Sequence, residues 1–306
     1  PLPQQQQEAY DKRRLGLGVT GVADMLIMLG VTYGSDKAVA IMDFVAREIA
    51  LAAYWASVEL AKEKGAFPKF DADGYLASGT FAQRLCEYDP DLEKAIRKHG
   101  IRNSHLTSIA PTGTISLYAG NVSSGIEPVF RTVYKRRRKV NPNDTGVHVD
   151  FVDEVGDSFE EYIVYHKKFL EWMRVNNIDT EKRYSQEEID ALVARSPYYK
   201  ATANDVDWLM KVRMQGAIQK WVDHSISVTV NLPNDVDEAL VNKLYVEAWR
   251  SGCKGCTIYR DGSRSGVMIA VSKADKKEAK KDKEPTPEMP VNPMQNVVEV
   301  RPKELE

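Results

Sequence analysis

The sequence is poor in cysteine, in net charge and in long apolar runs. Three cysteines among 306 residues, an odd number, argue against a secreted disulfide scaffold and favour a reducing cytoplasm. The formal charge of -2 predicts no general attraction to nucleic acid or to anionic membranes. No run approaches the roughly 18 apolar residues of a membrane span, and we expect no signal peptide. These absences predict a globular cytoplasmic protein.

Two familiar nucleotide-binding signatures are missing or incomplete. No Gly-x-x-x-x-Gly-Lys-Ser/Thr occurs in the chain, so there is no Walker loop. Residues 16–21 form a formal Gly-x-Gly-x-x-Gly, but the charged residues 11–14 precede it where a dinucleotide fingerprint needs an apolar strand. Close packing of a helix explains these glycines better than a cofactor does.

The most informative stretch is residues 104–116. Residues 104–110 are mostly apolar or β-branched and predict a short buried strand, which Pro111 ends because it has no N–H to donate. Gly113 would let a phosphate approach the backbone, and a helix beginning near Thr114 would point free N–H groups at the turn. An ordinary threonine-capped loop is the alternative. The predicted phosphate-binding residues are Pro111, Thr112, Gly113, Thr114, Ile115 and Ser116.

The rest of the chain predicts helices alternating with strands. Helical spacing or capping indicates helices at 22–29, 36–64, 76–86, 90–99, 158–175 and 236–251. It also indicates one helix that begins at 184–188 and another that residues 204–208 introduce and that runs through 219. Alternation and β-branching indicate strands at 225–232 and 255–260. Strands separated by helices of this length point to parallel pairing in an α/β architecture.

Two further stretches invite functional interpretations. Residues 121–130 form a polar loop in which Glu127 either meets a hydroxyl ligand or ends a strand. Residues 135–139 are five consecutive basic residues, which would suit nucleic acid. The run has no interleaved aromatics, so a solvated strand edge or loop is the favoured interpretation.

Cys253 and Cys256 form a Cys-x-x-Cys. Zinc would need four ligands, yet Cys86 is the only other cysteine and no paired histidines are suitably spaced. A redox pair would place its first thiol at a helix N-terminus, whereas this pair lies between a helix end and a strand. Buried structural thiols are therefore favoured, and no metal is expected. His224, before the clearest strand, is the one histidine that could have a functional role, and a satisfied core histidine is the favoured interpretation.

Five ordered motifs resemble the C-terminal half of the large chain of ribonucleotide reductase. They lie at residues 13–21, 59–68, 111–116, 125–128 and 252–264. The adenosylcobalamin-dependent class II enzyme is the most similar variant, because a single Tyr259 is followed by Arg260 where class I chains carry a Tyr-Tyr pair. The resemblance implies that residues 13–272 form the second half of a ten-stranded α/β barrel. A flexible lead at 1–12, a disordered charged and Pro-rich linker at 273–296 and the start of a truncated segment at 297–306 would flank it.

The same resemblance implies a reaction and a site. A cysteine thiyl radical generated with the cobalamin would reduce the ribose 2'-hydroxyl of a ribonucleotide. Residues 111–116 would hold the substrate phosphate, and Gly125, Ile126, Glu127 and Tyr259 would be candidates to line the active site.

The chain also departs from the family pattern. The finger loop Asn-x-Cys-x-Glu is missing, and Cys86 does not fit it. We therefore expect no catalytic residue in this chain and no activity by it alone. Its expected partners are the N-terminal half of the reductase, a ribonucleotide and, for the complete enzyme, a thioredoxin-type reductant. A non-catalytic nucleotide- or phosphate-binding module is the alternative, and neither membrane nor nucleic acid is an expected partner.

Overall fold

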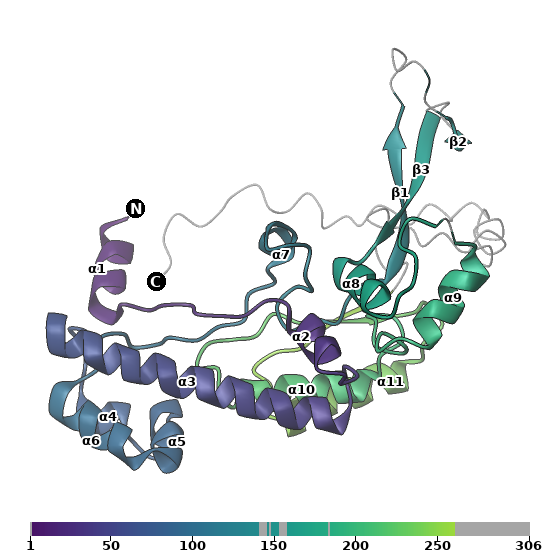
Figure 1. Ribbon diagram of the computed structural model, residues 1–306. Helices are drawn as coiled ribbons and strands as arrows, with labels where there is room; N and C mark the ends of the chain where they lie inside the picture. The colour runs from purple at the N-terminus through teal and green to yellow at the C-terminus, as the bar shows by residue number, and fades with distance from the viewer. Residues whose placement is uncertain (1, 141–145, 147, 153–157, 183, 261–306) are drawn as a thin grey trace, which may run out of the picture. The chain divides into compact units, whose positions relative to one another are not determined.

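The computed structural model describes residues 2–140, 146, 148–152, 158–182 and 184–260. The segments expected at 273–296 and 297–306 lie outside the described residues. The helices are α1 (Pro3–Lys12), α2 (Val22–Met28), α3 (Asp36–Lys64), α4 (Ala72–Tyr75), α5 (Phe81–Tyr88), α6 (Pro90–His99), α7 (Gly113–Tyr118), α8 (Lys167–Val175), α9 (Gln186–Ala194), α10 (Trp208–Gln219) and α11 (Glu238–Arg250) (Figure 1). The strands are β1 (Val133–Lys139), β2 (Phe151–Val152), β3 (Ser158–Tyr165), β4 (Thr229–Leu232) and β5 (Thr257–Arg260).

A row of parallel extended segments forms the centre of the fold. Segment 105–109 lies between segments 15–17 and 224–227, and backbone hydrogen bonds join it to both. Strand β4 continues the last segment and pairs in parallel with β5. The paired residues are Leu17 with Thr107, Ile109 with Ile226 and Thr229 with Thr257. The predicted parallel α/β pairing is confirmed, while the described residues show no closed barrel.

The glycines at 16 and 18 serve this row and not a helix, contrary to the sequence-based explanation. An ideal Cβ on Gly18 would lie 2.2 Å from the carbonyl oxygen of Ser108, and one on Gly16 would lie 2.8 Å from the Ser108 hydroxyl. Only glycine lets segment 15–17 approach segment 105–109 this closely.

Local signals set most helix ends where the sequence predicts them. Ser35 caps α3 by accepting a hydrogen bond from the Ala38 amide at 3.2 Å, and Gly65 ends the helix with a φ of 77°. Ser185 and Glu188 form the predicted capping box of α9. Helix α10 packs beside α3 and α11, as Figure 1 shows, and together they cover the central row.

The helix predicted at 158–175 is wrong in its first half. Residues Ser158–Tyr165 form strand β3, and only Lys167–Val175 form helix α8. Strand β3, which is rich in aromatic and β-branched residues, pairs antiparallel with β1. This distant pairing outweighs the helical spacing that the local sequence offers.

Two other expectations concern exposed segments. Residues 3–12 form α1, where a flexible lead was expected. The helix buries none of its residues and is supported by Pro3 at its first position and by the hydrogen bond from Gln7 to Asp11. Strand β1, which contains the basic run, is an edge strand of the sheet β1-β3-β2. This position matches the strand-edge interpretation of the basic run.

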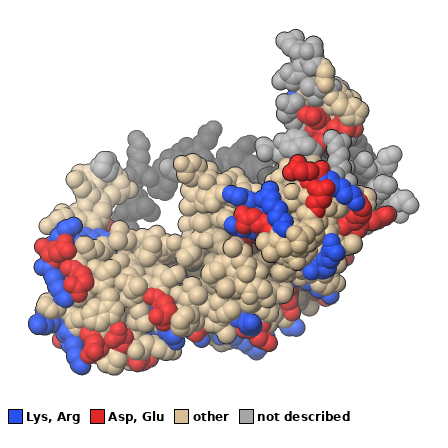
Figure 2. All heavy atoms as spheres, viewed as in Figure 1, with Lys and Arg blue, Asp and Glu red and all other residues tan. Residues whose placement is uncertain are grey.

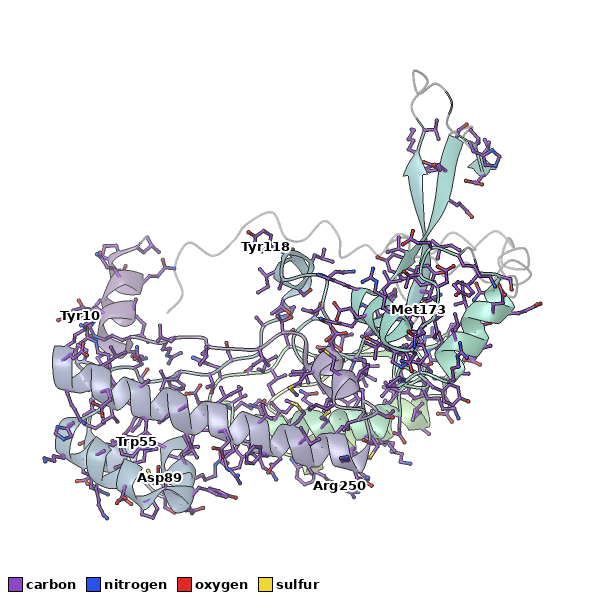
Figure 3. The ribbon with its side chains drawn as sticks, in the orientation of Figure 1. Tyr10, Trp55, Asp89, Tyr118, Met173 and Arg250 are labelled. Atoms are coloured by element: carbon purple, nitrogen blue, oxygen red, sulfur yellow. The ribbon has the colours of Figure 1, made fainter. Side chains whose placement is uncertain are left out.

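The apolar side chains gather in a large cluster under the central row and a smaller one near its C-terminal end. The larger joins α2, α3, α5, α6, α8 and α10 to the row. At its margin the Trp55 indole donates to the Asp89 carboxylate at 2.7 Å, which fixes the junction of α5 and α6 against α3 (Figure 3). The smaller cluster, here called the C-terminal cluster, consists of Val212, Val230, Leu232, Leu244 and Ala248.

Among the described residues, no helix combines the length and apolarity needed to cross a membrane. On the face shown in Figure 2, basic and acidic side chains are interspersed and do not gather by sign.

Candidate functional site

An open groove of about 600 Å³ runs over the central row of segments. Its walls come from residues more than 200 positions apart in the chain, brought together by the parallel pairing. The lining residues are Leu15, Gly16, Ser108, Ile109, Ala110, Pro111, His224, Ser225, Ile226, Ser227, Val228, Gly255, Cys256 and Thr257.

Serine hydroxyls give the groove a polar face. In the strand predicted at 225–232, Ile226 and Val228 are buried, whereas Ser225 and Ser227 are exposed. Successive side chains of an extended segment point to opposite faces, so the serines lie on the groove side. The alternation in the sequence was the signal for this face, which sequence reasoning used for the strand and not for the site.

The turn at 111–116 continues the segment that forms one wall of this groove. Pro111 lines the groove, and Gly113, Thr114 and Ile115 are exposed. The predicted helix follows as α7, whose last residue, Tyr118, is 96% exposed and points away from the body in Figure 3. The turn is therefore exposed to solvent at residues 113–115, while residues 112–116 lie outside the groove lining.

The turn has three hydroxyls, those of Thr112, Thr114 and Ser116, and two of them already make hydrogen bonds within the protein. Thr112 Oγ1 accepts a hydrogen bond from the Gly125 amide at 2.6 Å and lies 3.1 Å from Thr20 Oγ1. Because Thr20 donates its own proton to the Ser123 carbonyl at 2.8 Å, Thr112 must donate to Thr20. This fixes Thr112 in a left-handed conformation, with a φ of 52°.

Ser116 is committed in the same way, because its side chain is buried against Gly113 and Ser124. Its hydroxyl lies 3.3 Å from the Gly113 carbonyl oxygen and 3.2 Å from Ser124 Oγ. The donors left outward are the Thr114 hydroxyl and the amides of Gly113, Thr114 and Ile115, which have no hydrogen-bond partner in the part of the chain that the structure describes.

Behind the turn, Glu127 and Lys211 form an ion pair at 2.5 Å. The side chain of Lys211 is only 1% exposed and that of Glu127 22%. Lys211 also donates to the Thr229 carbonyl at 2.5 Å, and Glu127 accepts from the Thr229 amide at 2.7 Å. Burial lowers the pKa of Lys211, although the Glu127 carboxylate opposes this shift. The pair therefore joins loop 121–127, α10 and the start of β4.

The other predicted lining residues lie outside the groove lining. Gly125 and Ile126 are buried, and the Ile126 carbonyl accepts a hydrogen bond from the Tyr33 hydroxyl at 2.6 Å. Tyr259 is half-buried in β5, opposite Asn231 of β4. Glu127 holds the loop through Lys211. Gly125 supports the turn directly, because its amide donates to Thr112 Oγ1. Ile126 and Glu127 hold the same loop to Tyr33 and to Lys211.

Asp223 is a buried anchor that sequence reasoning missed. Its carboxylate accepts hydrogen bonds from the amides of Leu106 and Thr107 at 2.7 and 2.9 Å and from the Tyr54 hydroxyl at 3.0 Å. Burial raises the pKa of Tyr54 well above its usual value, so the phenol stays a donor. Only its position beside His224, at the start of a strand, marked Asp223 in the sequence. It fixes segment 105–109 at one end of the groove.

The cysteines differ from the expectation of buried thiols. Cys86 is buried, but Cys253 and Cys256 are half-buried, and Cys256 lines the groove. Burial raises the pKa of Cys86 and of Cys253 to about 11 and also raises that of Cys256. No group of three or more His, Cys, Asp or Glu side chains among the described residues is placed to hold a metal ion.

His224 lines the groove beside His105. The ring centroids lie 4.8 Å apart, and the two rings are tilted by 32°. Desolvation lowers the pKa of His105, and the neighbouring His224 adds to this effect. Both histidines lie at the opposite end of segment 105–109 from the turn.

Comparison with known proteins identifies relatives over most of the chain. Residues 1–259 match the family described as "Ribonucleotide reductase, barrel domain". The vitamin B12-dependent ribonucleoside-diphosphate reductase of Mycobacterium tuberculosis (strain CDC 1551 / Oshkosh) is 33% identical over 270 residues, which are 88% of this chain and 34% of that protein. The protein of the same name from Thermoplasma acidophilum is 31% identical over 282 residues, which are 90% of this chain and 32% of that protein.

More distant likenesses extend the comparison. The ribonucleoside-diphosphate reductase subunit alpha of Treponema pallidum is 27% identical over 265 residues, 86% of this chain and 26% of that protein. The solved alpha subunit of the Actinobacillus ureae class Id ribonucleotide reductase shares the fold, with a TM-score of 0.57 at 18% identity, over 84% of this chain and 40% of that one. The chain spans about a third of the length of the first two curated relatives.

Proposed function

Because the chain belongs to the family of the ribonucleotide reductase barrel domain, we propose that it forms part of a reductase that converts ribonucleotides to deoxyribonucleotides. The names of the curated relatives support a ribonucleoside diphosphate as the substrate. The contribution proposed for this chain is one wall of the substrate groove and the turn that holds the charged end of the substrate.

The proposal that the turn binds phosphate rests on its free hydrogen-bond donors. The outward amides of Gly113, Thr114 and Ile115 and the Thr114 hydroxyl have no partner among the described residues, and they follow directly on the groove wall at Pro111. A phosphate accepts hydrogen bonds from such donors without a lysine. The network of Thr112 then acts by holding the backbone of the turn in its left-handed conformation.

Substitutions on α7 test this role in the complete reductase that contains the chain. Thr114→Glu places a carboxylate among the outward donors, where it repels a phosphate. Leu117→Glu adds the same charge to the last turn of the same helix, at a side chain that is 62% exposed. Loss of one charge-assisted contact corresponds to about tenfold or more in affinity. We expect KM for a ribonucleoside diphosphate to rise by about that factor in Thr114→Glu and to stay within about twofold in Leu117→Glu.

A binding comparison makes the test specific to phosphate. Calorimetry of the complete enzyme with a ribonucleoside diphosphate and with the unphosphorylated nucleoside should show that Thr114→Glu weakens only the first. Equal effects of the two glutamate variants, or an equal loss for both ligands, would contradict the proposal.

We assign the cobalamin cofactor to the complete enzyme and to no residue of this chain. The names of the Mycobacterium tuberculosis and Thermoplasma acidophilum relatives support adenosylcobalamin. A thioredoxin-type reductant is proposed for the complete enzyme on the same family basis.

The radical-bearing cysteine is also proposed to lie outside this chain. None of the three cysteines stands in an Asn-x-Cys-x-Glu sequence. We expect the purified chain to form no deoxyribonucleotide with adenosylcobalamin and a dithiol, as measured by chromatography of the nucleosides, whereas the complete enzyme should form it.

A further inference from the structure

Cys253 and Cys256 lie in the turn between α11 and β5, on one small apolar core. Both side chains pack against the C-terminal cluster, and both are half-buried. Cys253 Sγ lies 3.8 Å from the carbonyl oxygen of Val212 on α10, whereas Cys256 lines the groove. One thiol therefore faces the interior and the other is open to a small molecule in the groove.

The backbone around the two cysteines is bent and loosely surrounded. The chain bends at Lys254, and Gly252, just before Cys253, has a φ of 73°. An added Cβ on Gly252 or Gly255 would meet no atom within 4 Å. The Cys253 amide donates to the Ala248 carbonyl at 3.0 Å, which fixes one end of the turn. A short, bent and loosely packed turn with one fixed end can bring two side chains together at little cost in strain.

From this geometry we propose that Cys253 and Cys256 form a reversible intramolecular disulfide in the wall of the groove, with a low-molecular-weight disulfide as the oxidant. Two thiols alone would leave zinc two ligands short, so the dithiol and disulfide forms are the chemistry that fits the pair.

The reaction balances with that oxidant alone. The Cys256 thiolate attacks one sulfur of the small disulfide, whose S–S bond breaks and releases one thiolate. The Cys253 thiolate then attacks Cys256 Sγ, forms the intramolecular bond and releases the second thiolate. Two electrons pass from the protein to the small disulfide, which becomes two thiols, and the two protein thiols give up their protons. An excess of the reduced small thiol reverses both steps.

Cys86 provides a matched internal control. Burial raises its pKa to about 11, as for Cys253, but it lies in the larger core with no neighbouring thiol. Cys86 and Cys253 should therefore both react slowly, because both thiols stay protonated. Only Cys253 and Cys256 have a neighbouring thiol with which to form a disulfide.

To test this, the complete protein is equilibrated in a series of glutathione buffers in which the proportion of oxidised glutathione increases. After trapping with iodoacetamide and digestion, the peptide that carries both cysteines should lose two hydrogen atoms and gain no label, while Cys86 stays a free thiol. Excess reduced glutathione should restore two labelled thiols. In Cys256→Ser, Cys253 should remain free or carry a single glutathione.

Several results would overturn the proposal. Folded protein in which Cys253 and Cys256 stay alkylatable across the titration would do so, as would separate glutathione adducts on both. A bond that forms only in urea would show that the two positions are too far apart in the folded chain. Circular dichroism of Cys253→Ser and Cys256→Ser, compared with Cys86→Ser, establishes that each variant is folded before it is scored.

Discussion

The buried ion pair of Lys211 and Glu127 supports a quantitative prediction about stability. Lys211→Met keeps the length of the side chain but removes the ammonium group. Glu127 then retains only its hydrogen bond from the Thr229 amide, and the Thr229 carbonyl loses its donor. Breaking one side of a buried pair costs about 3–5 kcal/mol. Because the Glu127 side chain is 22% exposed and water reaches it, we expect about 3 kcal/mol, the lower end of that range.

A second lysine at the end of the same helix gives the control. Lys220 lies 3.5 Å from Asp43, with its side chain 62% exposed. Exposed pairs contribute about 0.2–1 kcal/mol, so Lys220→Met should cost less than about 1 kcal/mol. Urea unfolding of both variants, followed by circular dichroism, measures the difference in midpoint at constant slope.

The double variant Lys211→Met/Glu127→Gln removes the uncompensated charge as well. It should recover part of the loss, because a neutral amide is less costly to bury than an unpaired carboxylate. A cost for Lys211→Met no larger than that for Lys220→Met would contradict this prediction, as would a double variant less stable than Lys211→Met alone.

Three further predictions concern the turn, the groove and the central row. Thr112→Val removes the acceptor for the Gly125 amide and should cost about 1–3 kcal/mol in urea unfolding, while Thr112→Ser, which keeps the hydroxyl, should lose far less. The pKa of His105 in the folded protein lies below the usual 6.5, so His105 takes up a proton in the unfolded chain first as the pH falls. Its contribution to the free energy of unfolding is therefore fully present above pH 6.5 and declines below it. The unfolding midpoints of His105→Gln should therefore fall less between neutral and mildly acidic pH, and an equal fall would contradict this. Gly18→Ala should lower the free energy of unfolding by about 1–3 kcal/mol, because its Cβ would meet the Ser108 carbonyl oxygen. A variant that melts at the same temperature as the parent protein would contradict this.

The sequence was sufficient to predict helix ends that depend on interactions between neighbouring residues. The cap at Ser35, the stop at Gly65 and the capping box at Ser185 act within a few residues, and each helix has the end that these signals predict. The strand β3 was misread because its partner β1 lies outside any local window, and a spacing typical of an amphipathic helix competed with it.

The candidate site shows the same division. The position of the turn at 111–116 and the extended segment before it follow from Pro111 and the flanking apolar residues. Which hydroxyls remain for a ligand depends on Thr20, 92 residues from Thr112 along the chain. The role of Lys211 was likewise invisible, because its partner Glu127 is 84 residues away. Such pairings become known only when the fold brings the segments together.

The central row also bears on how quickly the chain can fold. The bond between the Leu106 amide and Asp223 closes a span of 117 residues. Closing a flexible span of that length costs about 4 kcal/mol in chain entropy before any contact forms. Local helices such as α3 and α6 carry no such entropic cost, so we expect them to form before the central row of segments. The groove that this row supports is then expected to form late in folding.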